Sequence, residues 1–296
     1  RTSRRFRIRR DAQEHDDELV LSVYTIILND YSPIISSVAQ MSSKKILLLN
    51  DTSDYHSGCE KVIESFTFDY SIKTDSRIDI DFKQFDLVIL NGEGTMHSSR
   101  TNSVRFLRAL RDAQNNGCET HLVNSVWQNM TNDFDDVLQK CDIIEVREIL
   151  SKNELKEKHD IDSEIKWDRS LNIDVPYEKR KYEEVYQGSW FFERSDVKPI
   201  NGNIRYPRIN IFKQKWNDIV NRLRNSKLLI TGRHHEACAA IKARCKFIVL
   251  SGNTHKNEGL FLNVGVQPKN KINMIEDILN GKYDDDYEKI NEYYKC

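Results

Sequence analysis

Short apolar runs alternate with amphipathic segments along the chain from residue 44 onward. Four of the apolar runs are typical of buried strands: residues 45–49 (KILLL), 86–90, 120–124 and 142–146. Between them, residues 61–66 begin a predicted helix, and residues 103–113 carry Val104, Leu107 and Leu110 at helical spacing, with Gly117 as a stop signal. Strands that alternate with helices predict a parallel sheet, as in a Rossmann-like domain.

The second half of the chain repeats this alternation after a charged connector at residues 177–184 (YEKRKYEE). The pattern predicts a strand at 185–192, a helix at 212–223, a strand at 227–230, a helix at 236–244, and further helices at 272–279 and 284–294. Ser151 and Glu154 have the spacing of a capping box and predict a helix that leads into Leu155. We therefore expect an α/β fold of two Rossmann-like domains facing a cleft, at residues 43–168 and 169–296, with an N-terminal extension at 1–42.

The predicted extension has an unusual charge pattern. Six arginines lie within residues 1–10, and the apolar run of residues 19–28 follows after an acidic stretch. Ten apolar residues are too few to cross a bilayer, which takes about 20. We therefore expect no membrane span, and interpret the apolar run as a packed strand or helix and the arginines as a solvated tail.

Composition limits the classes of function. Charged residues make up 31% of the 296 residues but the net charge is only −1, so nucleic acid is not an expected partner. The six cysteines form no C-x-x-C pair, which indicates reduced thiols and a cytoplasmic protein. The histidines, including His56, His97, His235 and His255, show no tight ligand spacing, so no metal is expected. The oligomeric state is not predicted.

Cationic side chains lie where a strand is expected to meet a helix. Thr231 is followed by Gly232, Arg233, His234 and His235, and Lys256 follows the next apolar run. In an open α/β sheet, ligands collect at the carboxyl ends of the strands, where helix N-termini favour anions. Arg147 also comes directly after a predicted strand. We therefore expect an anionic small-molecule donor. Alternatively, Arg147 forms an ion pair with Glu148 or Glu154 on the surface of the protein.

Five stretches in this order resemble the polysaccharide pyruvyl transferases: NDT with HSGCE (residues 50–60), LVILNGEGTMH (87–97), VREILSKNEL (146–155), TGRHHEA (231–237) and THKNEGLF (254–261). The resemblance implies a fold similar to the GT-B glycosyltransferases. It also implies transfer of a pyruvyl group from phosphoenolpyruvate, the co-substrate, to a carbohydrate hydroxyl as a ketal, with no further cofactor. The motif positions that bind the donor in that family match Arg147, Arg233, His235 and Lys256. The chain departs from the family pattern at residues 51–60, which hold one glycine, and at His234, a second histidine.

The chemistry of such a transfer suggests roles for individual residues. A histidine can donate a proton near neutral pH, and we predict that His235 is this acid, with His234 either facing the ligand or packed beside it. Glu93 is the predicted base, ahead of Asp51 and His97, because the flanking Gly92 and Gly94 would let its carboxylate approach a ligand closely. Alternatively, Glu93 pairs with a helix N-terminus or binds sugar hydroxyls. The remaining predicted acceptor or loop contacts are Asp51, His56, Asn91, Gly92 and His97.

Two other functions fit the same residues. A glycosyltransferase of the same two-domain shape would bind the diphosphate of a nucleotide sugar at Arg233 and Lys256. A non-catalytic protein would bind an anionic ligand through the same cations, with an affinity that depends strongly on salt.

Overall fold

The computed structural model describes residues 44–178, 184–188, 206–250 and 252–295. The extension predicted for residues 1–42, with its arginine-rich and apolar runs, lies outside the described residues. The same holds for the part of the predicted strand 185–192 that follows residue 188. The described residues from 45 onward belong to one compact unit. The domain boundary expected after residue 168 stays a prediction.

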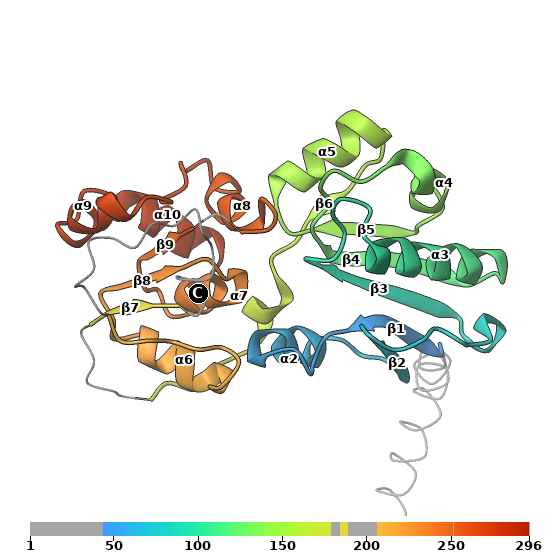
Figure 1. Cartoon of the computed structure of the whole chain (residues 1–296), viewed down its shortest axis with the longest axis horizontal. Coiled ribbons are helices and arrows are strands. Elements are labelled where there is room, and N and C mark those ends of the chain that lie inside the picture. The colour runs from blue at the N-terminus through green and yellow to red at the C-terminus, as the bar shows by residue number, and fades with distance from the viewer. Residues whose placement is uncertain (1–43, 179–183, 189–205, 251, 296) are drawn as a thin grey trace, which may run out of the picture. The chain divides into compact units, whose positions relative to one another are not determined.

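The first half of this unit contains a parallel sheet of six strands in the order β2-β1-β3-β4-β5-β6 (Figure 1). Its core consists of apolar side chains such as Leu47 and Leu49, which have no exposed surface. The predicted strands at 45–49, 86–90, 120–124 and 142–146 are confirmed with small shifts of their ends. Two edge strands were not predicted, because both are short and half-exposed. The strands are β1 (Ile46–Asp51), β2 (Tyr70–Lys73), β3 (Leu87–Glu93), β4 (Glu119–Ser125), β5 (Ile143–Val146) and β6 (Glu164–Ile165).

The first residues of the helices in this half were predicted only approximately. The prediction that a helix begins at residue 61 was wrong by four residues, since α2 starts at Ser57 and His56 caps it. The predicted capping box was also wrong: α5 starts at Ile149, and the Glu148 side chain accepts the Ser151 backbone N–H at 2.9 Å. The helices are α2 (Ser57–Glu64), η1 (Phe82–Gln84), α3 (Thr101–Asn115), η2 (Asn132–Phe134), α4 (Asp135–Leu138), α5 (Ile149–His159) and η3 (Arg169–Asn172).

The second half contains a parallel sheet of three described strands in the order β7-β8-β9. The central strand β8 is fully buried, as its run of apolar residues predicts. The helix expected at 212–223 begins later, at Trp216, after a turn over residues 211–213. The elements are β7 (Val185–Gln187), α6 (Trp216–Leu223), β8 (Leu228–Thr231), α7 (His234–Lys242), β9 (Phe247–Val249), α8 (Lys256–Leu262), η4 (Ile272–Met274), α9 (Ile275–Leu279) and α10 (Asp284–Tyr293).

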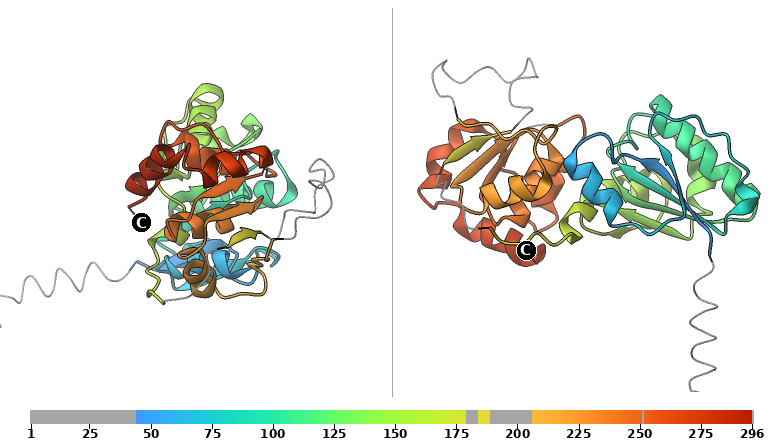
Figure 2. Two further views of the ribbon diagram at one scale, coloured as in Figure 1. Left: turned by 90° about the vertical axis from the view of Figure 1, so that its left-hand side faces the viewer. Right: turned by 90° about the horizontal axis from the view of Figure 1, so that it is seen from below.

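Each half has its own hydrophobic core, and the two halves touch through helices. Helix α2 contacts α6 and α7, and α5 contacts α8, as Figures 1 and 2 show from different sides. Two Rossmann-like halves that meet across a cleft are the GT-B-like α/β fold that the sequence predicts. Within the described residues, no helix is both long enough and apolar enough to cross a membrane.

Candidate active site

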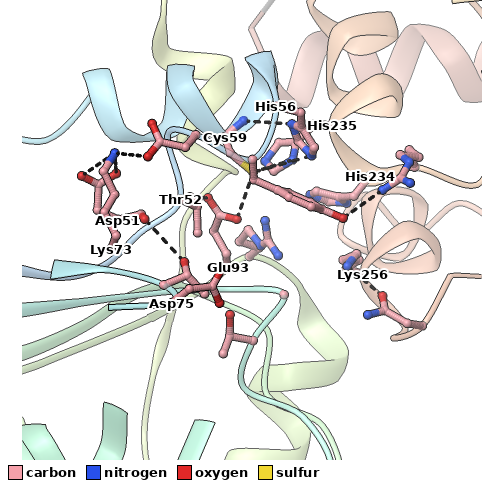
Figure 3. A pocket seen from close by; sticks show the side chains of 18 of the residues that line it. Asp51, Thr52, His56, Cys59, Lys73, Asp75, Glu93, His234, His235 and Lys256 are labelled. Atoms are coloured by element: carbon pink, nitrogen blue, oxygen red, sulfur yellow. Dashed lines mark hydrogen bonds and ion pairs between the residues drawn. The ribbon is translucent and has the colours of Figure 1, made fainter. Parts of the chain in front are cut away.

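A cavity of about 700 Å³ lies between the two halves, and residues from both line it (Figure 3). Parallel strands point their carboxyl ends at this cavity. Asp51 and Glu93 end β1 and β3, Arg147 follows β5, and Arg233 follows β8. The cavity therefore occupies the place where open α/β sheets bind ligands. Its lining residues are Asp51, Thr52, Asp54, Tyr55, His56, Cys59, Lys73, Thr74, Asp75, Ser76, Glu93, Gly94, Thr95, Arg147, Gly232, Arg233, His234, His235, Asn253 and Lys256.

The structure brings all the predicted donor-binding residues to this one cavity. Arg147 comes from the first half, whereas Arg233, His234, His235 and Lys256 come from the second. The Lys256 Nζ atom donates to Asn253 Oδ1 at 2.9 Å, and burial, followed by the nearby Arg147 charge, lowers the pKa of Lys256 to about 8. Several cations from both halves thus face one volume, as an anion with more than one charged group requires.

A buried carboxylate that the sequence did not single out links these cations. Asp168 is 2% exposed and forms an ion pair with Arg147 at 2.5 Å. Its Oδ2 atom also lies 3.3 Å from His234 Nε2 and 3.5 Å from His235 Nε2. Burial alone would raise the pKa of Asp168, but His235 and Arg147 hold it well below its usual value. The alternative of a surface ion pair for Arg147 was wrong, because the side chain is buried against Asp168.

The two histidines begin helix α7, directly after Arg233. Both are buried and both line the cavity. Burial and position are thus the same for the two rings, and the expectation that one faces the ligand while the other packs stays a prediction. Burial, with the Arg147 charge second, lowers the pKa of His234 to about 3 even though Asp168 opposes the shift. The His234 ring is therefore neutral at physiological pH.

Helix α2 approaches His235 closely because residue 58 is glycine. A Cβ atom at Gly58 would lie 2.5 Å from the Cβ of His235, closer than real Cβ atoms come. The absent side chain lets the N-terminus of α2 reach the N-terminus of α7. The HSGC stretch of the sequence is thus a contact between the two halves as well as part of the cavity wall.

A chain of polar contacts crosses the cavity from His56 to Glu93 through Cys59. His56 Nδ1 accepts the Cys59 backbone N–H at 3.2 Å, so the proton of the neutral ring is on Nε2, 3.6 Å from Cys59 Sγ. The thiol donates to Glu93 Oε2 at 3.4 Å and lies 3.9 Å from His235 Nδ1. Burial, then His235 and Arg233, lower the pKa of His56 to about 2, and burial with the Glu93 charge raises the pKa of Cys59 well above its usual value.

Glu93 lies in the cavity wall with a constrained backbone. Its φ of +40° is in the left-handed region, and its Oε1 atom accepts a 2.7 Å hydrogen bond from Thr52. The next helix along the chain begins only at Thr101, but the Glu93 carboxylate contacts Cys59 in the first turn of α2, so the alternative that Glu93 pairs with a helix N-terminus stays a prediction. The role expected for Gly92 also needs correction: a Cβ there would lie 2.3 Å from Ser125 Oγ, so this glycine fits strand β3 against β4 rather than admitting a ligand.

Three further residues that were predicted to contact the acceptor are either paired within the protein or lie outside the cavity lining. Asp51 lines the cavity, but its carboxylate accepts from Ser71 at 2.7 Å and pairs with Lys73 at 3.3 Å. Asn91 is buried beneath the cavity, where it joins the Asn50 side chain, and does not line it. His97 is buried outside the lining, and burial lowers its pKa to about 4.

Among the residues that the structure describes, two groups of side chains have ligand atoms close enough for a metal ion. One is His56, Cys59 and His235, and the other is Asp168, His234 and Cys238. In the first, the His56 tautomer directs a proton toward the sulfur, and Arg233 lies nearby, so a dication would meet positive charge. In the second, the Asp168 carboxylate already forms an ion pair with Arg147. The expectation that no metal binds at either group stays a prediction.

Sequence reasoning missed Asp168 and Cys59. Asp168 lies three residues beyond β6, a two-residue strand that no periodicity reveals. Cys59 is three residues from His56, which places both at the start of one helix. That spacing was a usable signal, but the contact with Glu93 depends on the tertiary structure.

Comparisons with known proteins give structural likeness only. No protein-family model matches the sequence, and no curated protein matches it. The chain is similar to the solved structure of a putative UDP-N-acetylglucosamine 2-epimerase from Listeria monocytogenes, with 12% identity, a TM-score of 0.53, and coverage of 84% of this chain and 91% of the other. A second similar structure is a UDP-GlcNAc 2-epimerase from Neisseria meningitidis bound to UDP-GlcNAc, with 10% identity, a TM-score of 0.48, and coverage of 83% and 94%. At this identity the first likeness establishes the shared fold.

Proposed function

We propose that this protein is a transferase that binds a phosphorylated donor in the cavity and moves a group from it to a hydroxyl of a carbohydrate. The observation that carries the proposal is the convergence of Arg147, Arg233 and Lys256 from two halves on one cavity beside His235. A protein that only packed these side chains would not need to gather them around 700 Å³ of open volume. Cavities of about 300–1,000 Å³ are typical of small-molecule sites.

The charges of the site suit a phosphorylated anion. Asp168 balances the buried Arg147 charge, so Arg233 and Lys256 supply the positive charge that a donor would meet first. A guanidinium binds a planar carboxylate or phosphate through two parallel hydrogen bonds, and an ammonium adds a point charge. Helix α7 begins at His234, so its N-terminal backbone N–H groups face the same anion.

The two predicted catalytic groups come from different halves of the protein. His235 would donate a proton to the donor, while the Asp168 carboxylate, 3.5 Å from its Nε2 atom, would stabilise the protonated ring. Glu93 would accept the proton of the attacking hydroxyl, with Thr52 and Cys59 holding its carboxylate. A base and an acid on facing halves can act on the two sides of one bound substrate.

Phosphoenolpyruvate is the donor that the sequence resemblance implies. His235 would protonate its terminal enol carbon, and the oxygen of one sugar hydroxyl would bond to the adjacent carbon while Glu93 accepts the proton of that hydroxyl. A second hydroxyl of the sugar would then close the ketal as the C–O bond to phosphate breaks, and its proton would leave with the phosphate. The motif residues matched to the donor site, Arg147, Arg233, His235 and Lys256, all line the cavity, which supports this candidate.

A nucleotide sugar is the second candidate, and the structural comparison supports it more directly. The similar Listeria protein is described as a putative UDP-N-acetylglucosamine 2-epimerase, so its fold is associated with a nucleotide-sugar substrate. In this case a sugar hydroxyl would attack the anomeric carbon, and the nucleoside diphosphate would leave while bound to Arg233 and Lys256.

Calorimetric titration distinguishes the donors. Phosphoenolpyruvate, UDP-N-acetylglucosamine and UDP alone would each be titrated into the wild type, Arg233→Ala, Lys256→Ala and the exposed control Lys282→Ala. The donor should bind the wild type and Lys282→Ala equally, and should bind the two cavity variants at least tenfold more weakly. If neither donor binds, or if Lys282→Ala weakens binding as much as Arg233→Ala does, the proposed donor site is refuted.

Turnover separates an enzyme from a binding protein. The donor that binds would be incubated with a panel of simple glycosides, and release of phosphate or of nucleoside diphosphate would be measured. His235→Ala should abolish release while changing the donor Kd only modestly. Tight, strongly salt-dependent binding without any turnover would favour the non-catalytic anion-binding protein instead.

A further inference from the structure

The cavity has two chemically different sides. Figure 3 shows His234 and Lys256 on one side, Asp51, Lys73 and Asp75 on the other, and Glu93 and His235 between them. The first side holds the donor in the proposed function. Nothing in that function accounts for the second side.

The second side is acidic and rich in hydroxyl groups. Three carboxylates, on Asp51, Asp54 and Asp75, line it together with Lys73, which pairs with Asp51 at 3.3 Å and with Asp54 at 3.1 Å. A second cation, Arg105, donates to the backbone carbonyl of Ser76 at 2.7 Å. Two cations do not neutralise three carboxylates, so this side carries net negative charge. The hydroxyl groups of Thr74 and Ser76 also line it. Such a surface suits an uncharged ligand with many hydroxyl groups and repels an anion.

An exposed aromatic ring lies between the two sides, because Tyr55 follows Asp54 in the chain and its hydroxyl reaches Arg233. Tyr55 lines the cavity although 58% of its surface remains exposed. Its ring is held in place from two directions, by Phe212 in an edge contact at 5.4 Å and by His56 at 4.8 Å. Arg233 lies 4.4 Å above the Phe212 ring and reaches the Tyr55 hydroxyl at 3.4 Å. A rigid aromatic ring with an exposed surface beside carboxylates and hydroxyls is an arrangement that binds the apolar face of a ring whose edge is polar.

We propose that Tyr55, Asp54 and Asp75 form the acceptor subsite, and that it binds an uncharged pyranose ring in preference to an acidic sugar. The inference rests on the proposed transferase function and names its second substrate. Tyr55 packs against the flat face of the ring, and the carboxylates accept hydrogen bonds from its hydroxyls. The ring then lies on the Glu93 side of the cavity, where the predicted base accepts a hydroxyl proton.

Two substitutions at Tyr55 separate its ring from its hydroxyl. Tyr55→Phe keeps the ring and removes the contact with Arg233, whereas Tyr55→Ala removes both. We expect Tyr55→Ala to raise the KM for a methyl glycoside acceptor at least tenfold, with Tyr55→Phe near the wild-type value and the donor Kd of both within twofold. Tyr70→Ala is the control, because Tyr70 is a similarly exposed tyrosine of the same half outside the cavity.

The charge preference is tested with a matched acceptor pair. The methyl glycoside that the wild type accepts best and the uronic acid of the same sugar would be compared by kcat/KM. The uncharged acceptor should be preferred about fivefold or more, the factor for one pair of charges about 4 Å apart in water. The double variant Asp54→Asn, Asp75→Asn should lose most of that preference, and raising the salt concentration should reduce it in the wild type.

Each outcome counts for or against the subsite. A donor Kd that weakens in Tyr55→Ala while the acceptor KM stays unchanged would make this side a nucleoside subsite and overturn the proposal. Equal use of the uronic acid and the uncharged sugar would overturn the charge preference. If the wild type binds no donor at all, the transferase proposal itself has failed, and the calorimetry described above reveals this before any acceptor is tested.

Discussion

Arg147 and Asp168 form a 2.5 Å ion pair in which neither side chain is more than 3% exposed. The two residues follow neighbouring parallel strands, β5 and β6, and the Asp168 carboxylate continues to the two histidines that begin α7. One buried carboxylate therefore holds a cation of the first half and the proposed acid of the second half in a common arrangement.

Removing one partner of this pair should destabilise the protein strongly. Arg147→Met leaves the Asp168 charge buried without its main partner, which costs about 3–5 kcal/mol in free energy of unfolding. The double variant Arg147→Met, Asp168→Leu should be less destabilised than Arg147→Met, because no buried charge remains. Denaturant unfolding measures both values, and donor titration should show that neither variant binds normally. A double variant as unstable as the sum of the two single variants would mean that the pair does not act as a unit.

Gly58 should not tolerate a side chain. In a helix, glycine to alanine usually stabilises by about 1 kcal/mol. Here the new Cβ would lie 2.5 Å from the His235 Cβ, so α2 and α7 must separate. We expect Gly58→Ala to lower the free energy of unfolding by about 1–3 kcal/mol and to reduce turnover. Glu60→Ala, on the exposed side of the same helix, should leave both quantities near wild type. A stabilised Gly58→Ala protein would contradict the close contact.

Mild acid should destabilise the folded protein through His56. Its pKa in the folded state is about 2, far below the usual 6.5, because burial and the charges of His235 and Arg233 oppose protonation. The unfolded chain takes up the proton below pH 6.5 and the folded chain does not, so this stability is present above pH 6.5 and is lost as the pH falls. At pH 5 the loss amounts to about 2 kcal/mol. His234, whose pKa is about 3, acts in the same direction.

Urea unfolding at pH 5 and pH 7.5 measures this effect. His56→Asn keeps an acceptor at the start of α2, since asparagine is a favourable N-cap, but has nothing to protonate. Its stability should therefore fall less between the two pH values than that of the wild type. Equal losses in both proteins would show that His56 is not held neutral by the fold.

Alkaline pH should weaken donor binding through Lys256. Burial and the Arg147 charge lower the pKa of this ammonium to about 8, so the free protein loses the charge as the pH rises through 8. The Kd of the donor should rise between pH 7 and pH 9.5 by up to tenfold per pH unit above 8. Lys256→Arg stays charged throughout and should show a flatter profile. If both profiles have the same slope, the loss has another source.

The alternation of apolar and polar positions was sufficient to predict the fold class. Strands such as 86–90 are continuous apolar runs because both faces of a parallel sheet are covered, and that signal is local in the sequence. Element ends were less well predicted. Helix α5 begins where Glu148 can accept the Ser151 N–H, and a sequence that also contains Ser151 and Glu154 in capping-box spacing does not show which cap forms.

The cationic members of the site were also visible in the sequence, because Arg147 and Arg233 directly follow apolar strands and such positions meet at one edge of a sheet. Only the tertiary structure decided that Asp168 pairs with Arg147 and that Cys59 links His56 to Glu93. It also decided that residue 58 has no room for a side chain, because His235 packs against it. Each of these is a contact between residues on different elements, and its existence depends on how the two halves pack rather than on any spacing along the chain.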